Sequence, residues 1–296
     1  MAPMTISARD VAELRARTGA GMMDCKKALE EAGGDLSRAA EILRARGIAK
    51  AEKRAGRATS QGLIGVAVTA DGSAGAMIEL SCETDFVARN EDFQKAVDTL
   101  LSQALATHPM SLEEFLQQPS KGPHGETVMD HVKELTAKTG ENVSLRNVVK
   151  YAPGHTGLVG LYLHHNRQVG VLVELECGSE GVARGSGAQD LAREIALHIA
   201  SADPIAVRPE DIPAEVIDRE RRIADEQVAQ EGKPEAIRGK IVEGKIKKFL
   251  AERTLLNQPW VKDDKKTVGD LVAEASRQVG SAISVTRFTR IKVGEG

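Results

Sequence analysis

The chain has 296 residues with 40 Lys and Arg against 43 Asp and Glu, so its formal net charge of −3 gives no general attraction for nucleic acid or an anionic membrane. It has no apolar run of the roughly 18 residues that a membrane helix needs, and its first residues lack the pattern of a signal peptide, so we expect a cytoplasmic protein. Three cysteines, an odd number, do not form a disulfide framework. The charge is uneven, because residues 1–58 carry +4 and the rest −7.

Caps and glycine breaks predict three helices in the first fifty residues. Ser7, with Asp10 three residues later, is suited to cap the first helix, and Asp35 is suited to cap the third. Glycines follow each predicted helix, and the third is expected to end near Gly47. The arrangement resembles the three-helix ubiquitin-associated (UBA) module.

A basic stretch follows the predicted bundle, and we interpret it as a solvated tether. It contains Lys50, Lys53, Arg54 and Arg57 but no interleaved aromatic residue that could stack on bases. Nucleic-acid binding as the main role is therefore the weaker alternative.

Residues 62–89 recur without a gap at 157–184, and ten of the twenty-eight positions are identical. Seven of the other eighteen positions exchange one aliphatic residue for another. After the second predicted strand, the segment Thr84-Asp85-Phe86-Val87 becomes Ser179-Glu180-Gly181-Val182, so the second copy is expected to have lost a short turn. Phe86 directly after a strand is a poor turn residue unless something binds it. It could instead fold back as a plug of its own subunit, but the second copy manages without it, which favours a binding anchor.

The repeat resumes with a larger offset. The first pair of matching segments, 62–89 and 157–184, is separated by 95 residues, whereas residues 127–148 match 267–288 at a separation of 140. The second unit therefore carries 45 extra residues between its two matching segments. In the first unit two strands joined at Asp71-Gly72 precede a helix that Asn90 begins, and each unit reads as strand, strand, helix, helix, strand.

The extra residues predict an antiparallel helical hairpin that breaks at Gly232-Lys233-Pro234. Apolar residues on the two arms are expected to face one another: Val216, Ile223 and Val228 against Ile237, Ile241 and Phe249.

These patterns predict an α+β protein. Residues 1–57 form a UBA-like three-helix bundle with its basic linker, and residues 58–152 form a first β-β-α-α-β core subdomain. Residues 153–212 and 253–296 form its duplicate, and residues 213–252 form a coiled-coil hairpin inserted in the duplicate.

Catalytic and ligand-binding alternatives are weaker. Cys82 and Cys177 alternate with apolar residues, as buried core cysteines do, and Cys25 lies near Lys26 and Lys27 without an evident His–acid pair. His164 and His165 are neighbours that a strand would direct to opposite faces, so a metal site is not favoured. The stretch 239–245 approaches a P-loop but places Ile246 where the hydroxyl should be, and 185–187 lacks the third glycine of a dinucleotide site.

Several segments closely resemble bacterial elongation factor Ts, and the similarity covers essentially the whole chain in order. They are RTGAGMMDCKKAL at 17–29, CETDFVARN at 82–90, KTGENVSLR at 138–146, EGKPEAIRGKIVEGKIKKFL at 231–250, NQPWV at 257–261 and KTVGDLV at 266–272. This resemblance implies a guanine-nucleotide exchange factor for the GTPase elongation factor Tu, acting by differential binding. It implies no enzyme activity, no catalytic residue, no metal or other cofactor, and no direct binding of nucleotide, nucleic acid or membrane.

The resemblance also assigns roles to matching positions. Asp85 and Phe86 are expected to reach the GTPase domain near its magnesium site, with Thr84 and Val87 holding the turn. Arg15, Met22, Met23 and Lys26 resemble a second contact with the same domain. Further contacts with the partner are expected at Gly140, His164 and Val268, and along the coiled coil. Many members continue into a further helical module after the last strand; this sequence ends at Gly296, so the N-terminal module and the core are expected to carry more of the binding.

Overall fold

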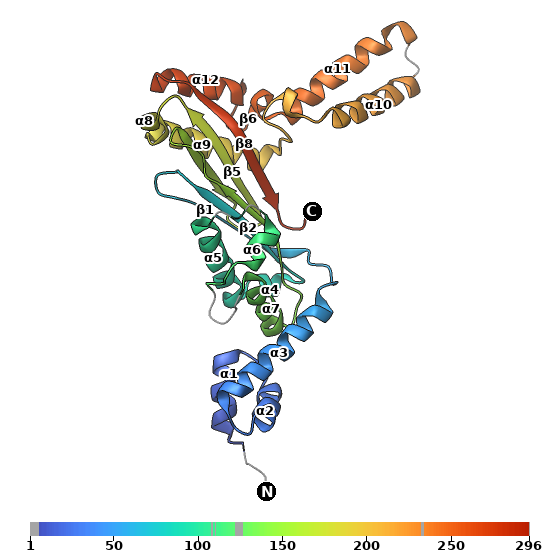
Figure 1. Ribbon diagram of the computed structural model, residues 1–296. Coiled ribbons are helices and arrows are strands. Elements are labelled where there is room, and N and C mark those ends of the chain that lie inside the picture. Colours follow the sequence, from blue (N-terminus) through green and yellow to red (C-terminus); the bar gives the residue numbers. More distant parts are fainter. Residues whose placement is uncertain (1–5, 108, 110, 122–126, 232–233, 296) are drawn as a thin grey trace. The chain divides into compact units, whose positions relative to one another are not determined.

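The computed structural model describes residues 6–107, 109, 111–121, 127–231 and 234–295. The chain divides into two compact units. Unit 1 comprises Met1–Gly65, Met77–Lys150 and Lys292–Gly296, and unit 2 comprises Val66–Ala76 and Tyr151–Ile291. Helices combine with small sheets, two of which have three strands, in the orders β1-β2-β3 and β4-β5-β8 (Figure 1), which confirms the α+β class.

Unit 1 begins with the three predicted helices, α1 (Ala8–Thr18), α2 (Met22–Glu31) and α3 (Leu36–Arg54). The Ser7 hydroxyl accepts a hydrogen bond from the backbone N–H of Asp10, and the Asp35 carboxylate accepts from the first turn of α3. Each cap satisfies backbone donors that a helix start leaves free. The three helices enclose their own apolar cluster of Val11, Leu14, Cys25, Ala28, Leu29, Ala32, Ala39 and Leu43.

The predicted end of the third helix is wrong, because α3 continues through Gly47 to Arg54, and the expected linker is largely helical. The reason lies in packing against α7 (Val128–Thr139). A Cβ added to Gly47 would lie 2.8 Å from the Cβ of Ala137, so glycine here permits close approach of two helices and does not end one. Most residues after Gly47 are good helix formers, and they continue the helix once that contact forms.

Two glycine-to-alanine substitutions should therefore change the stability of their helices in opposite directions. Gly244 lies within α11 (Glu235–Arg253) and has open space at its Cβ position, so Gly244→Ala should slow amide hydrogen exchange in α11 by the equivalent of about 0.5–1 kcal/mol. Gly47→Ala forces α3 and α7 apart and should accelerate exchange in α3 by the equivalent of about 1–3 kcal/mol. Equal protection from both substitutions would contradict the close contact at Gly47.

The first three-stranded sheet, most of which belongs to unit 1, is built from β1 (Gln61–Val68), β2 (Gly75–Cys82) and β3 (Ser144–Tyr151). Between β2 and β3 lie α4 (Asp85–Ala88), α5 (Glu91–Ala106), α6 (Leu112–Gln117) and α7. The side chain of Asn90 begins α5, as predicted, whereas the short α6 was not expected. Phe93 of α5 and Phe115 of α6 are fully buried.

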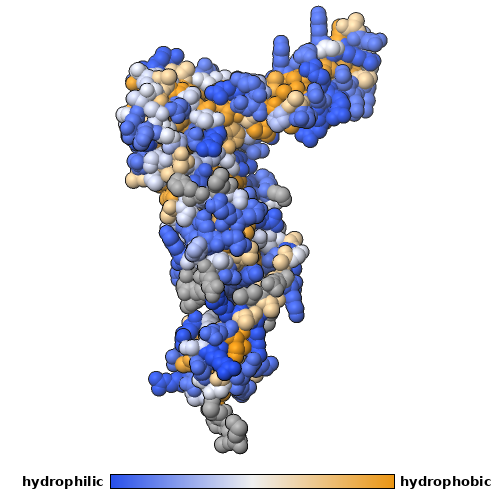
Figure 2. All heavy atoms as spheres, viewed as in Figure 1, coloured by the Kyte–Doolittle hydropathy of each residue, from blue (hydrophilic) through white to orange (hydrophobic). Residues whose placement is uncertain are grey.

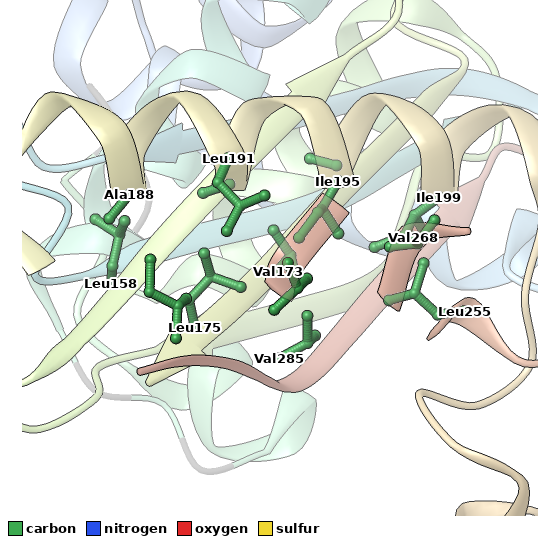
Figure 3. Packing of buried hydrophobic residues seen from close by; sticks show 14 of the residues in the cluster. Leu158, Val173, Leu175, Ala188, Leu191, Ile195, Ile199, Leu255, Val268 and Val285 are labelled. Atoms are coloured by element: carbon green, nitrogen blue, oxygen red, sulfur yellow. The ribbon is translucent and has the colours of Figure 1, made fainter. Parts of the chain in front are cut away.

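The sheet of unit 2 is built from β4 (Gly157–Leu163), β5 (Val169–Cys177) and β8 (Ile283–Lys292). β4 and β5 are antiparallel, with Gly157 opposite Glu176 and Leu163 opposite Gly170. The main helices are α9 (Ser186–Ala202) and α12 (Val268–Val279), and shorter elements are α8 (Glu180–Ala183), β6 (Pro259–Trp260), β7 (Asp263–Thr267), and the 3-10 helices η1 (Pro209–Asp211) and η2 (Leu255–Asn257). Figure 3 shows Leu191 and Ile195 of α9 directed at Val173 and Leu175 of β5, which forms the core of this unit.

The two sheets are accompanied by matching local hydrogen bonds. α7 and α12 each begin with a reciprocal Thr–Asp capping box, at Thr127 and Thr267. The backbone N–H of Val143 donates to the hydroxyl of Thr136 at 3.1 Å, and Ile283 donates to Ser276 at 3.1 Å. These pairs occupy equivalent positions of the sequence repeat, so the repeat extends to individual polar contacts.

The extra residues of unit 2 form two antiparallel helices, α10 (Ala214–Gln230) and α11, which lie side by side (Figure 1). Their buried seam consists of Ala224, Val228, Val242 and Ile246. The predicted facing of Ile223 and Ile237 is wrong, because their side chains are 42% and 44% exposed. Figure 2 shows hydrophobic side chains at the surface of this arm. The predicted break includes Gly232 and Lys233, which lie outside the described residues.

Candidate functional site

The segment that distinguishes the two sequence copies is one turn of helix, α4, directly after β2. The hydroxyl of Thr84 accepts from the backbone N–H of Val87 at 3.4 Å and so caps the turn. Asp85 forms an ion pair with Arg89 one turn later, at 3.1 Å. Ala88 is buried beneath the turn, whereas the side chain of Phe86 is 82% exposed. The turn therefore presents an aromatic ring to solvent from a hydrogen-bonded base.

This geometry corrects the alternative in which Phe86 plugs its own subunit, because a plug would be buried. Large aromatic side chains gain about 1.5–3 kcal/mol from full burial, and this one forgoes most of that gain in the isolated chain. An exposed aromatic residue on a fixed turn has the properties of an interface hot spot.

The expectation that the second copy has lost the turn is also wrong. α8 occupies the equivalent position, and the hydroxyl of Ser179 accepts from Val182 at 3.4 Å, as Thr84 does from Val87. Either hydroxyl satisfies an N-cap, so the exchange of Thr for Ser preserves the turn. What differs is the side chain it carries, since Gly181 replaces Phe86.

The base of α4 is held by residues for which the sequence predicted no role. The carboxylate of Glu141 accepts two hydrogen bonds from Thr84, from its backbone N–H at 3.0 Å and from its hydroxyl at 2.6 Å. Glu83 accepts from the backbone N–H of Asn142 at 2.6 Å. The sequence contained a signal for these residues, because Glu141 and Asn142 of the first copy correspond to Ser281 and Ala282 of the second.

The predicted N-terminal contacts lie on α1 and α2 of unit 1, and all four side chains are exposed. Met22 and Met23 are 58% and 63% exposed at the start of α2, and Arg15 and Lys26 add positive charge on α1 and α2. Lys26 also forms a weak surface pair with Glu30 at 3.9 Å. Two neighbouring exposed methionines make an adaptable apolar surface.

The remaining predicted contacts differ in accessibility. Gly140 ends α7 with a φ of +76°, in the left-handed region that favours glycine. His164 is partly exposed in unit 2, and its Nδ1 lies 3.0 Å from the hydroxyl of Tyr162. Val268 is fully buried in the apolar cluster of unit 2, so its side chain is not available to a partner.

The histidine pair does not have the arrangement expected of strand neighbours. β4 ends at Leu163, and the ring centroids of His164 and His165 lie 4.2 Å apart, because both residues lie in the turn that follows the strand. Within the described ranges, no group of three His, Cys, Asp or Glu side chains could hold a metal ion. The stretch 239–245 that approaches a P-loop lies inside helix α11 and is not a loop.

The three cysteines are buried, which removes the basis of a thiol mechanism. Burial, aided by the negative charge of Glu141, raises the pKa of the Cys82 thiol from 9.0 to about 12, and burial also raises the pKa of Cys177. Cys25 is fully buried, and its thiol donates to the carbonyl of Ala20 at 3.6 Å. Reactive thiolates need the opposite environment, accessible and electropositive.

Iodoacetamide at about pH 8 should therefore label none of the cysteines in the folded protein and all of them in urea. Because the pKa of Cys82 is raised on folding, its contribution to stability is complete below pH 9 and is lost as the pH rises toward 12. Mass spectrometry after brief labelling measures the first effect, and urea unfolding followed as the pH is raised above 9 measures the second. Rapid labelling of folded Cys82 at about pH 8 would contradict this description.

In the part of the chain that the structure describes, no helix is both long and apolar enough to span a membrane.

Comparison with known proteins agrees with the resemblance. A family model described as "Elongation factor TS" matches residues 83–295. The elongation factor Ts of Lawsonia intracellularis (strain PHE/MN1-00) is 44% identical over 294 residues, which cover 99% of this chain and 100% of the relative. That of Symbiobacterium thermophilum (strain DSM 24528 / JCM 14929 / IAM 14863 / T) is 47% identical over 98% of this chain and 93% of the relative. That of Aquifex aeolicus (strain VF5) is 46% identical over 98% and 99%.

These matches define the class as the elongation factors of protein biosynthesis. Because the family model covers well over half of the chain and the relatives match nearly all of it, the chain belongs to the elongation factor Ts family.

Proposed function

We propose that this protein binds elongation factor Tu with GDP bound and promotes release of the GDP, so that GTP can bind in its place. Asp85 and Phe86 act as a wedge near the nucleotide and magnesium site of Tu, and Thr84 and Val87 hold the wedge. The observation that carries the proposal is the exposure of Phe86 on a capped turn, whereas the second copy of the sequence keeps the turn but carries Gly181.

Linkage explains how such a factor works without chemistry. A protein that binds nucleotide-free Tu more tightly than GDP-bound Tu weakens GDP binding by the same ratio. A thousandfold acceleration of release corresponds to roughly 4 kcal/mol at the barrier. Burial of Phe86 in the partner, together with disturbed magnesium coordination, is a source of that order. No bond is made or broken, so the proposed factor has no catalytic residue and needs no cofactor.

The other accessible predicted residues are proposed to bind the same partner. Arg15, Met22, Met23 and Lys26 form a second contact with the GTPase domain, and the hairpin of α10 and α11 touches that domain from another side. Gly140 and His164 are proposed as contacts to further parts of Tu. The proposed interactions involve neither direct nucleotide binding nor stable binding of nucleic acid, and the site of action is the cytoplasm.

We propose for the architecture a UBA-like module at 1–57 and a core of two duplicated subdomains. The first subdomain spans 58–152, and the second spans 153–212 and 253–296, interrupted by the coiled-coil hairpin at 213–252. The matching capping boxes at Thr127 and Thr267 support the duplication.

Release of a fluorescent GDP analogue from the matching Tu tests the function directly. The analogue is preloaded, excess unlabelled GDP is added, and fluorescence is followed with and without this protein at substoichiometric concentration. We expect each molecule of the factor to accelerate release from many molecules of Tu. No acceleration by folded protein, with a Tu that binds and releases nucleotide normally, would overturn the proposal.

A further inference from the structure

The hydrogen bonds between Glu141 and Thr84, at the base of α4, are more than the turn needs in order to form. Both oxygens of the Glu141 carboxylate are used, one for the backbone N–H and one for the hydroxyl of Thr84, at 3.0 and 2.6 Å. The same hydroxyl caps α4 by accepting from Val87. Hydrogen bonds to an ionised carboxylate are shorter and stronger than neutral ones.

The second copy shows what the turn needs in order to form. α8 has the same length as α4 and the same hydroxyl cap, but Ser281 stands where Glu141 stands in the first copy. In the described part of the chain, no carboxylate bonds to the cap residue Ser179. The turn thus forms without the carboxylate, and the copy that carries Phe86 is the copy that has it.

The residue next to Glu141 extends the same support. The backbone N–H of Asn142 donates to Glu83, and its side-chain amide donates to the carbonyl of Arg57 at 2.8 Å. Arg57 in turn pairs with Glu83 at 3.5 Å. Two consecutive residues therefore connect the base of α4 to the segment that leaves α3, all within unit 1.

We propose that Glu141 is a positioning residue for exchange, which holds the turn of Asp85 and Phe86 in the orientation that enters the partner. This inference rests on the proposed function. A four-residue helix has only marginal stability on its own. An exposed Phe on a mobile turn would lose more conformational freedom on binding than one on a fixed turn. The two hydrogen bonds from Thr84 to Glu141 restrict the turn already in the free protein, so that less freedom is lost on binding.

Exchange assays on Glu141→Ala, Glu141→Gln and Ser281→Ala test the proposal. We expect Glu141→Ala to slow exchange about tenfold, because both bonds to Thr84 are lost. Glu141→Gln keeps an oxygen that accepts from the Thr84 N–H and should recover part of the rate. Ser281→Ala changes the equivalent position of the second copy and should leave exchange unchanged. The inference would be overturned if Glu141→Ala exchanged at the wild-type rate while Phe86→Ala lowered the rate strongly. The proposed function would still stand in that case.

A double variant separates positioning from a purely structural effect. If Glu141 acts through Phe86, adding Glu141→Ala to Phe86→Ala should slow exchange no further. A full additional tenfold loss in the double variant would mean that Glu141 acts elsewhere. Amide hydrogen exchange gives an independent readout, since Glu141→Ala should accelerate exchange in α4 and leave α5 protected. If Phe86→Ala itself exchanges like the wild type, the proposed function fails first, and this inference fails with it.

Discussion

Phe86→Ala is expected to lower GDP exchange by well over tenfold while the protein remains folded. The ring is 82% exposed, so its removal creates no cavity in the chain, and the caps and ion pairs of α4 do not involve it. In the complex, the same ring would be buried in the partner, where truncation of an aromatic hot spot commonly costs 2 kcal/mol or more. The measurement is release of the fluorescent GDP analogue, with urea unfolding as the check on stability.

The matched control is Gly181→Phe in the second copy. The Cβ position of Gly181 is open, so a Phe can be accommodated on α8, which has the same cap. We expect neither a gain in exchange nor, in the Phe86→Ala background, any rescue, since the second turn should face away from the nucleotide site. Wild-type exchange by folded Phe86→Ala would remove the wedge from the mechanism, and rescue by Gly181→Phe would show that the two turns are interchangeable.

Local signals predicted several of the helix starts in the described part of this fold. A hydroxyl or carboxylate at Ser7, Asp35 and Asn90 satisfies nearby backbone donors whatever the tertiary context, so sequence alone locates these starts. Thr127 and Thr267 occupy matching positions of the internal repeat, and in the structure each begins a helix with a complete capping box.

The errors occurred where packing overrides local pattern. Gly47 has the sequence context of a helix end, but its contact with Ala137 comes from a helix about ninety residues later. The seam of α10 and α11 was predicted with Ile223 and Ile237 inside, but both are exposed. Val228 is buried in the seam, as predicted, and Ala224 is buried beside it. Facing pairs depend on the rotation of each helix about its axis, which apolar spacing alone does not determine.

The candidate site was found by comparing the copies, and the same comparison could have found more. The match of residues 127–148 with 267–288 pairs Glu141 with Ser281. Only the hydrogen bonds that Glu141 accepts from Thr84 give this difference a meaning. Differences between duplicated halves thus mark both the exposed ring and the residue that holds its base.

The second large effect concerns affinity. Replacing both Met22 and Met23 by Ala should raise the concentration of factor needed for half-maximal exchange roughly 30-fold or more, because two exposed side chains that would be buried in the partner are truncated. The maximal rate at saturation should stay near that of the wild type, if the proposed contact is equally strong before and during GDP release. Phe86→Ala should instead lower the maximal rate. A titration of the factor against a fixed amount of Tu gives both quantities.

Ile205→Ala is the matched control for the methionines. Ile205 is 43% exposed in unit 2 and belongs to none of the proposed contacts, so its truncation removes exposed apolar surface without a predicted effect on exchange. A lowered maximal rate with unchanged half-saturation in the double methionine variant would assign Met22 and Met23 to the wedge step itself. Unchanged values for both quantities would remove the N-terminal module from the binding surface. The expected separation, with the rate governed by α4 and the affinity by α2, follows from the roles proposed for the two surfaces. The proposed wedge acts only as GDP leaves, whereas the proposed methionine contact is present throughout the encounter.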